Sequence, residues 1–146
     1  MNDEVVKILL VEDNDDHVEL TKRALKENGV LNDIYVAKDG QKALDFLYRK
    51  GKYSEKTKAP RPGLILLDVK LPKIDGFEVL EKIKSDPDLK SIPVIILTTS
   101  SRDEEVAKGY AGGVNSYVTK PIDFNEFVNK IKSIRLYWVL VNKLPK

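Results

Sequence analysis

Five short apolar runs, separated by segments of helical periodicity, constrain the fold of this chain more than any other feature. They are rich in valine, isoleucine and leucine, which predicts β-strands. Strands that are apolar on both sides are buried on both sides, and so predict a parallel sheet covered by helices on each face. The expected fold class is α/β, with a doubly wound five-stranded parallel sheet. The runs are Val6–Val11, Ile34–Ala37, Leu64–Leu67, Val94–Leu97 and Tyr117–Val118.

The segments between these runs have apolar residues at spacings of three and four, as on the buried face of a helix. Gly29 and Gly51 follow the first two segments where C-terminal caps are expected, and the sequence SDP at 85–87 would end the third. A weaker fourth helix is predicted over 102–111, and a fifth begins at Asp123. The defining positions are Val18, Thr21 and Leu25; Ala43, Leu44 and Leu47; Val79, Leu80 and Ile83; and Phe124, Phe127, Val128, Ile131 and Ile134.

Composition excludes several classes of protein. A chain of 146 residues with 42% hydrophobic content suits one domain with a complete core. Its net charge of +2 does not predict a nucleic-acid partner. The absence of cysteine excludes disulfides, thiolate metal sites and cysteine nucleophiles. The first apolar run is too short for a signal peptide or a membrane span, so we expect a cytoplasmic protein that does not enter the membrane.

Polar side chains stand at the carboxyl ends of four predicted strands: Glu12 and Asp13, then Asp68, Thr98 and Lys120. These ends meet at one edge of a parallel sheet, where doubly wound folds bind ligands. Three carboxylates gathered there would repel one another unless a cation lay among them. Oxygen ligands without nearby histidine or cysteine favour Mg²⁺, which commonly shares its coordination with phosphate. The sequence therefore predicts a magnesium site used in phosphoryl chemistry.

Asp68 is a candidate nucleophile for that chemistry, because aspartate is a recognised acceptor of phosphoryl groups. Phosphoryl transfer depends on positioning and charge neutralisation, which Lys120 and the hydroxyl of Thr98 would assist. Each residue also has a simpler interpretation, Lys120 as a solvated charge and Thr98 as an ordinary strand residue. Acids after a strand can instead cap the next helix, and we assign that role to Asp15 or Asp16.

The sequence resembles the receiver domains of two-component response regulators over nearly its whole length. The resemblance is carried by LLVEDN at 9–14, LILLDVKLPKIDG at 64–76, IPVIILTTS at 92–100 and SYVTKPID at 116–123. It implies a flavodoxin-like (βα)5 receiver fold and a signalling protein that assists its own phosphorylation and dephosphorylation, not an enzyme. Asp68 would accept a phosphoryl group from a phosphohistidine on a sensor histidine kinase.

The same resemblance implies a set of metal ligands. Asp13 and Asp68 would bind Mg²⁺ (or Mn²⁺) directly, Glu12 through a water molecule, and Lys70 through its backbone carbonyl. Glu12 stands where aspartate is commoner, which lengthens the reach to the metal. Lys70 and Ser100 occupy positions that vary within the family and tune hydrolysis, so the lifetime of the phosphate is left open.

A switch is implied as well. Thr98 and Lys120 would contact the phosphoryl oxygens, and the peptide bond before Pro121 would be cis, which aims Lys120 into the site. When Thr98 moves to the phosphate, Tyr117 would turn inward and fill the vacated space. The change would be reported on the face formed by the fourth helix, the fifth strand and the fifth helix.

A narrower resemblance is to the stand-alone regulators paired with bacterial phytochrome kinases. It rests on ALDFLYRKGKY at 43–53, APRPGLILLD at 59–68, SDPDLKSIPVIILTTS at 85–100 and the ending YWVLVNKLPK. Some archaeal and bacterial regulators outside light sensing look similar, so the signal of the kinase stays open.

Two segments stand apart from this pattern. Residues 49–62 carry six basic residues against one glutamate, and predict either a solvated loop or a docking element for an acidic partner. The sequence LYWVLV at 136–141 is apolar on every side, so an extended C-terminal helix would either fold back onto the core or form a homodimer. We expect one receiver domain over 1–146, with a core of about 5–134, a C-terminal extension over 135–146 and no output domain.

Other chemistries lack their motifs: the sequence has no GxxxxGK[ST] loop, no GxGxxG and no GxSxG, and no covalent cofactor is expected. His17, the only histidine, is assigned to the solvent-facing side of a helix. A dehalogenase-type phosphatase would need a second aspartate where Lys70 stands. The serious alternative is a receiver fold that is never phosphorylated and serves only as a protein-interaction module.

Overall fold

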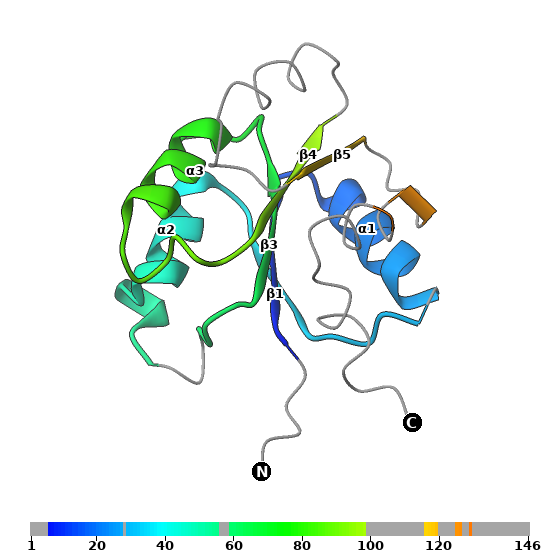
Figure 1. The fold of residues 1–146 in the computed structure, drawn as a ribbon, viewed down its shortest axis with the longest axis horizontal. Coiled ribbons are helices and arrows are strands. Elements are labelled where there is room, and N and C mark those ends of the chain that lie inside the picture. Colours follow the sequence, from blue (N-terminus) through cyan, green and yellow to red (C-terminus); the bar gives the residue numbers. More distant parts are fainter. Residues whose placement is uncertain are drawn as a thin grey trace.

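The computed structural model describes residues 6–27, 29–55, 59–98, 116–119, 125–126 and 129. At its centre is a sheet in which every strand runs parallel to its neighbours, in the order β2-β1-β3-β4-β5 (Figure 1). Each predicted apolar run overlaps one of these strands, with bounds that agree within two residues. They are β1 (Ile8–Val11), β2 (Ile34–Ala37), β3 (Leu64–Asp68), β4 (Val94–Thr98) and β5 (Ser116–Thr119).

The strand order reverses at β1. The chain passes from β1 to the edge strand β2 and then returns to the other side of β1 to form β3. In open α/β sheets, ligands bind beyond the carboxyl ends of the strands at such a reversal. Val11 is in register with both Ala37 and Leu67. The residues that follow β1 and those that end β3 therefore lie next to each other.

Helices cover both faces of the sheet, with α1 (Asp15–Glu27) on one face and α2 (Gly40–Tyr48) and α3 (Gly76–Ser85) on the other (Figure 1). The alternation of side chains along the strands divides the core accordingly. Leu9 and Leu67 pack on the side of α2 and α3, whereas Leu10 and Leu66 pack on the side of α1. All four are fully buried. The two central strands, β1 and β3, are thus fixed from both sides.

The cap of α1 differs from the prediction. The side chain of Asn14 accepts a hydrogen bond from the amide of His17 at 3.0 Å, so Asn14 is the N-cap. Asp15 and Asp16 lie in the first turn, where their charge favours the positive end of the helix dipole. At the other end the prediction holds: Gly29 has a φ of 87° and donates its amide to Lys26.

The end of α2 also differs from the prediction, because its left-handed cap is Arg49, with a φ of 56°. Gly51 also has a positive φ, of 60°, but lies two residues beyond this cap. The amides of Arg49 and Lys50 close the last turn by bonding to the carbonyls of Phe46 and Asp45. A side-chain hydrogen bond offsets the cost of this conformation for arginine: Nε of Arg49 donates to the carbonyl of Ala59 at 2.9 Å.

The basic segment 49–62 is not simply a solvated loop. A short 3-10 helix, η1 (Gly51–Tyr53), brings the Tyr53 ring against that of Phe46, with ring centroids 5.3 Å apart. Arg61 donates to the carbonyl of Leu47 at 2.8 Å, and Ala59 is buried. The two ends of the segment are therefore part of the α2 side of the core. Within the described part of the segment, Lys50, Lys52 and Arg61 are exposed, whereas Arg49 is half-buried.

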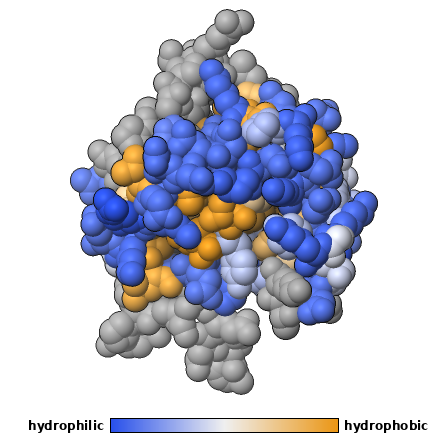
Figure 2. Space-filling model, turned by 180° about the vertical axis from the view of Figure 1, so that it is seen from behind, coloured by the Kyte–Doolittle hydropathy of each residue, from blue (hydrophilic) through white to orange (hydrophobic). Residues whose placement is uncertain are grey.

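The β2 edge of the sheet is partly open to solvent in the part of the chain that the structure describes. In the edge strand β2, Ile34, Tyr35 and Val36 are only half-buried, and the nearby Leu31 is exposed. Figure 2, which shows the reverse of the view in Figure 1, has a band of hydrophobic residues among hydrophilic ones. In the described ranges, no helix is both long enough and apolar enough to cross a membrane.

Several predictions fall outside the described residues. They are the helix over 102–111, the cis peptide before Pro121 and the C-terminal helix with its homodimer. Of the fifth predicted helix, Asn125, Glu126 and Asn129 are helical.

Candidate functional site

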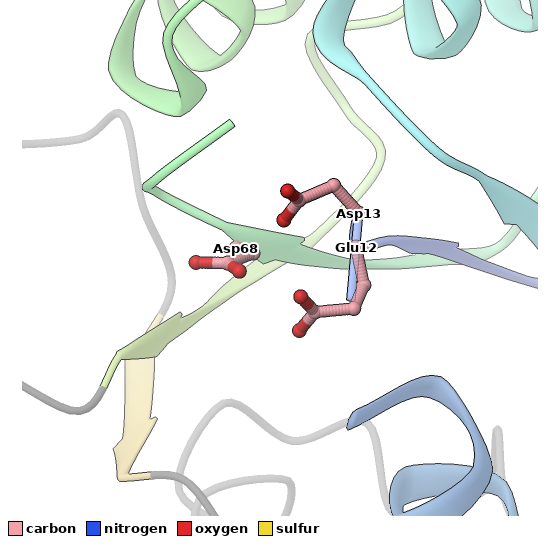
Figure 3. Close-up of side chains that lie close together, drawn as sticks. All are labelled: Glu12, Asp13 and Asp68. Atoms are coloured by element: carbon pink, nitrogen blue, oxygen red, sulfur yellow. The ribbon is translucent and has the colours of Figure 1, made fainter. Parts of the chain in front are cut away.

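Three carboxylates meet at the carboxyl ends of the two central strands. Glu12 and Asp13 directly follow β1, and Asp68 is the last residue of β3. One carboxylate oxygen from each of them lies within 4.8 Å of the others (Figure 3). The register of β1 on β3 produces this arrangement, because Val11 pairs with Leu67 and the next residues along are Glu12 and Asp68.

Two of the three carboxylates are buried. Glu12 has no exposed surface and Asp68 is 6% exposed, whereas Asp13 is open to solvent. Acids placed side by side in this way repel each other, and burial removes the water that would screen them. A divalent cation would offset both costs, and oxygen-only ligands suit Mg²⁺ or Mn²⁺. The residues present therefore fit such an ion.

Hydrogen bonds fix the orientation of the two buried acids. Oε2 of Glu12 accepts from the amide of Asn14 at 3.2 Å, and Oδ1 of Asp68 accepts from the amide of Lys70 at 3.0 Å. Both bonds join a carboxylate to an amide two residues further on, which holds each side chain against its own loop. The loop after β3 therefore turns back over Asp68 and carries the backbone of Lys70 to the edge of the site.

Close packing on the other side of that loop limits its freedom. A Cβ atom added at Gly76 would lie 2.4 Å from the carbonyl oxygen of Asp68 and 2.5 Å from Cα of Val69. The amide of Gly76 donates to the carbonyl of Val69 at 3.1 Å. Only glycine permits α3 to begin this close to the strand end.

His17 is a member of this neighbourhood that the sequence interpretation missed. Its side chain is 41% exposed, as a solvent-facing position predicts, but its Nδ1 also lies 3.8 Å from Oε2 of Glu12. The signal was available in the spacing. Since Asn14 caps α1, His17 lies in the first turn of the helix that begins beside the acids.

The remaining predicted site residues are only partly covered by the structure. Thr98 is the last residue of β4, and its neighbour Leu97 is in register with Asp68. Tyr117 lies in β5 and pairs with Ile96. The side chains of Thr98 and Tyr117, and the whole of Lys120, lie outside the described residues. The backbone of β4 thus brings Thr98 to the same edge of the sheet as Asp68.

Curated relatives cover most of this chain. The probable methanogenesis regulatory protein FilR2 of Methanothrix harundinacea is 41% identical over 138 residues, which are 94% of this chain and 86% of the relative. The response regulator Rcp1 of Synechocystis sp. is also 41% identical over 138 residues, 94% of this chain and 92% of Rcp1.

Solved structures agree with the fold. The bacteriophytochrome response regulator AtBRR has a TM-score of 0.86 at 42% identity, over 95% of this chain and 99% of its own. The Mn²⁺-bound form of Rcp1 has a TM-score of 0.73, and the phosphorylated cyanobacterial phytochrome response regulator RcpA has one of 0.74. Both are 40% identical over 97% of this chain and 99% of theirs. These similarities confirm the flavodoxin-like receiver fold.

The sequence model of the family described as "response regulator receiver domain" matches residues 8–132. This span contains the five strands and the three clustered acids. Proteins of this description are signalling proteins of two-component systems and not classical enzymes. The chain therefore belongs to the response regulator receiver domain family.

Proposed function

We propose that this protein is a stand-alone response regulator that accepts a phosphoryl group on Asp68 from a sensor histidine kinase, in a Mg²⁺-dependent reaction. The observation that carries the proposal is the cluster of Glu12, Asp13 and Asp68, whose carboxylate oxygens lie within 4.8 Å of one another at the strand-order reversal. Two of these acids are buried, and such a set is stable when a cation and a phosphoryl group complete it.

Asp13 and Asp68 would hold the ion directly, Glu12 through water, and Lys70 through its backbone carbonyl. When bound, the ion supplies positive charge to the phosphoryl oxygens. A carboxylate oxygen of Asp68 attacks phosphorus as the histidine nitrogen leaves, so that a P–O bond forms while the P–N bond breaks. The amide of Lys70, 3.0 Å from Oδ1, keeps the carboxylate of Asp68 oriented for this attack.

Thr98 and Lys120 complete the proposal as donors to the phosphoryl oxygens, and Tyr117 as the switch residue. The register of β4 on β3 supports Thr98, because it follows the partner of Asp68 directly. The phosphorylated relative RcpA supports the use of this fold as a phosphoacceptor, and the Mn²⁺-bound form of Rcp1 supports the ion. The protein would assist its own phosphorylation and dephosphorylation through these groups.

The partner is proposed to be a histidine kinase of the phytochrome type. AtBRR and RcpA are both described as phytochrome response regulators, which supports this pairing. FilR2 is named for methanogenesis, so a kinase with another stimulus remains the competing partner. The output in the cytoplasm is proposed to pass through protein contacts, including a homodimer formed by the C-terminal helix.

Incubation with Mg²⁺ and acetyl phosphate, followed by intact-mass measurement, tests the function. We expect the wild type to gain the mass of one phosphoryl group, and Asp68→Asn to gain none. Addition of EDTA should abolish the gain in the wild type. A wild type that folds but gains no mass would favour the alternative, a receiver fold that acts only as an interaction module.

A further inference from the structure

The loop that follows Asp68 contains a strained turn. Lys73 has a φ of 69°, and the amide of Ile74 donates to the carbonyl of Pro72 at 2.8 Å, as in a γ-turn of positive φ. This turn is rare and costs free energy in any residue with a side chain. It persists only where surrounding groups hold it. The groups that hold this turn also bear on the site, because the same loop carries the Lys70 carbonyl.

The first of these groups is Gly40, at the start of α2. A Cβ atom at this position would lie 2.2 Å from the carbonyl oxygen of Ile74 and 2.8 Å from its Cβ. The backbone of α2 therefore rests directly on the turn. Any other residue at position 40 would have to push the loop or the helix away.

The second group is the carboxylate of Asp39, which is 5% exposed. Its Oδ1 accepts from the amide of Lys42 at 2.7 Å and so caps α2. Its Oδ2 lies 3.7 Å from Nζ of Lys73. One carboxylate thus caps α2 and also pairs with the residue at the centre of the strained turn, whose side chain is 65% exposed.

The same short segment also contacts the loop that follows β1. The carbonyl of Ala37 accepts from the amide of Glu12 at 3.0 Å, and Nζ of Lys38 pairs with Asp15 in the first turn of α1. Residues 37–40 therefore touch both loops that carry the clustered acids. No residue of this segment belongs to the cluster itself.

We propose that residues 38–40 form a positioning element that sets the loop after β3, and with it the Lys70 carbonyl, and so determines the affinity of the site for a divalent cation. The inference rests on the proposed function. Asp39 and Gly40 act through the loop and are positioning residues, not ligands.

Gly40→Ala tests the proposal, and Gly63→Ala is its matched control. A Cβ atom at Gly63 also meets a close neighbour, Cγ1 of Val6 at 2.3 Å, but there the contact is at the start of β3, the far end of the sheet from the acids. Mg²⁺ affinity is measured by calorimetric titration. Amide chemical shifts of residues 70, 71, 73 and 74 are recorded in metal-free protein, and folding is checked by circular dichroism.

We expect Gly40→Ala to weaken Mg²⁺ binding by about tenfold and to shift the amide signals of residues 70, 71, 73 and 74. Gly63→Ala should bind Mg²⁺ within about twofold of the wild type, whatever it does to stability. In phosphorylation with acetyl phosphate, Gly40→Ala should need more Mg²⁺ for half-maximal rate and recover most of the rate at saturation. A folded Gly40→Ala protein that binds Mg²⁺ as tightly as the wild type would overturn the proposal.

Asp39→Asn and Lys73→Gln provide a second test that does not crowd the backbone. Asparagine still caps a helix, so Asp39→Asn removes the ion pair and leaves α2 intact. Each single variant should weaken Mg²⁺ binding by about two- to threefold, and the double variant no further, because both remove the same pair. Full additivity or no effect would count against the pair as a positioning contact.

Failure of the inference differs from failure of the proposed function. A wild type that binds Mg²⁺ and gains a phosphoryl group, together with Gly40→Ala and Asp39→Asn variants that behave identically, overturns the positioning element alone. A wild type that takes neither Mg²⁺ nor phosphoryl group overturns the proposed function and the inference that rests on it.

Discussion

Nδ1 of His17 lies 3.8 Å from Oε2 of Glu12, a carboxylate with no exposed surface. The imidazole and the amide of Asn14 both face Glu12 from the start of α1, so the helix terminus partly offsets its charge. Carboxylate oxygens of Asp13 and Asp68 lie within 4.8 Å of the same carboxylate. In the metal-free protein, the contacts from α1 to Glu12 therefore oppose the repulsion among the three carboxylates.

Glu12→Gln should stabilise the metal-free protein and lower its affinity for the divalent cation. The amide keeps the shape of the side chain but removes one of the two buried charges, which should raise the free energy of unfolding in EDTA by about 1 kcal/mol or more. Mg²⁺ affinity should fall by about tenfold. Urea denaturation with EDTA and with saturating Mg²⁺ measures both effects.

Glu81→Gln, an exposed position on α3, is the control for this experiment. It should change neither quantity appreciably. A Glu12→Gln protein that is no more stable than the wild type in EDTA would contradict repulsion at the site.

The partly buried amine of Lys84 should make the stability of the protein depend on pH in the alkaline range. Partial burial lowers the pKa of Lys84, because desolvation disfavours the charged amine. In the window between this lowered pKa and the ordinary lysine value, the unfolded chain binds more protons than the folded one. The free energy of unfolding should therefore rise as pH increases through that window.

Comparison of the wild type with Lys84→Met isolates this effect. Nζ of Lys84 donates to the carbonyls of Lys90 at 3.0 Å and Ile92 at 2.7 Å, so the variant should be less stable by about 1 kcal/mol at neutral pH. The difference should widen in favour of the wild type as pH is raised toward that of free lysine. Lys82→Met, on the exposed side of α3, should show no such widening, and a constant gap for Lys84→Met would contradict the assignment.

Arg49 should respond to substitution in an order set by its backbone. Arg49→Ala keeps a side chain at a φ of 56° and loses the bond to the Ala59 carbonyl, at a cost of about 2 kcal/mol. Arg49→Gly loses the same bond but relieves the strain, so it should be more stable than the alanine variant by about 1 kcal/mol. Chemical denaturation of the two variants gives the order directly. An alanine variant equal to the glycine variant would show that position 49 is not strained.

Truncation after Ile134 tests the predicted homodimer. The removed sequence includes LYWVLV at 136–141, whose apolar residues on every side favour contact with a second copy. Sedimentation should show the full chain as a dimer and the truncated chain as a monomer. An unchanged sedimenting mass would count against an interface in the C-terminal helix.

The strands and the acid cluster could be predicted because each depends on a short sequence pattern. Apolar runs locate β1 and β3, and parallel pairing brings their carboxyl ends together, so Glu12, Asp13 and Asp68 meet without further information. The order of the strands then places them at the reversal.

Other features depend on contacts that no local pattern reveals. The pairing of Asp39 with Lys73 joins residues far apart in the sequence, and nothing in either neighbourhood signals the other. Arg49 and Lys73 adopt positive φ although neither residue type favours it, because tertiary contacts hold them there. The acids that follow β1 predict a cap at Asp15 or Asp16, but asparagine caps a helix as well as aspartate does, and the choice of Asn14 depends on where β1 ends.

The full burial of β1 and β3 determines when the spacing of the three acids is lost during unfolding. Structural opening in a domain begins at edges and termini, and the innermost strands separate only when the whole fold melts. Since the acids stand on those innermost strands, fluctuations of the periphery should leave their spacing intact. Hydrogen exchange at Leu9, Leu10 and Leu66 should then be among the slowest measured in β1 to β3, and cation binding should disappear in the same cooperative transition as those protected amides.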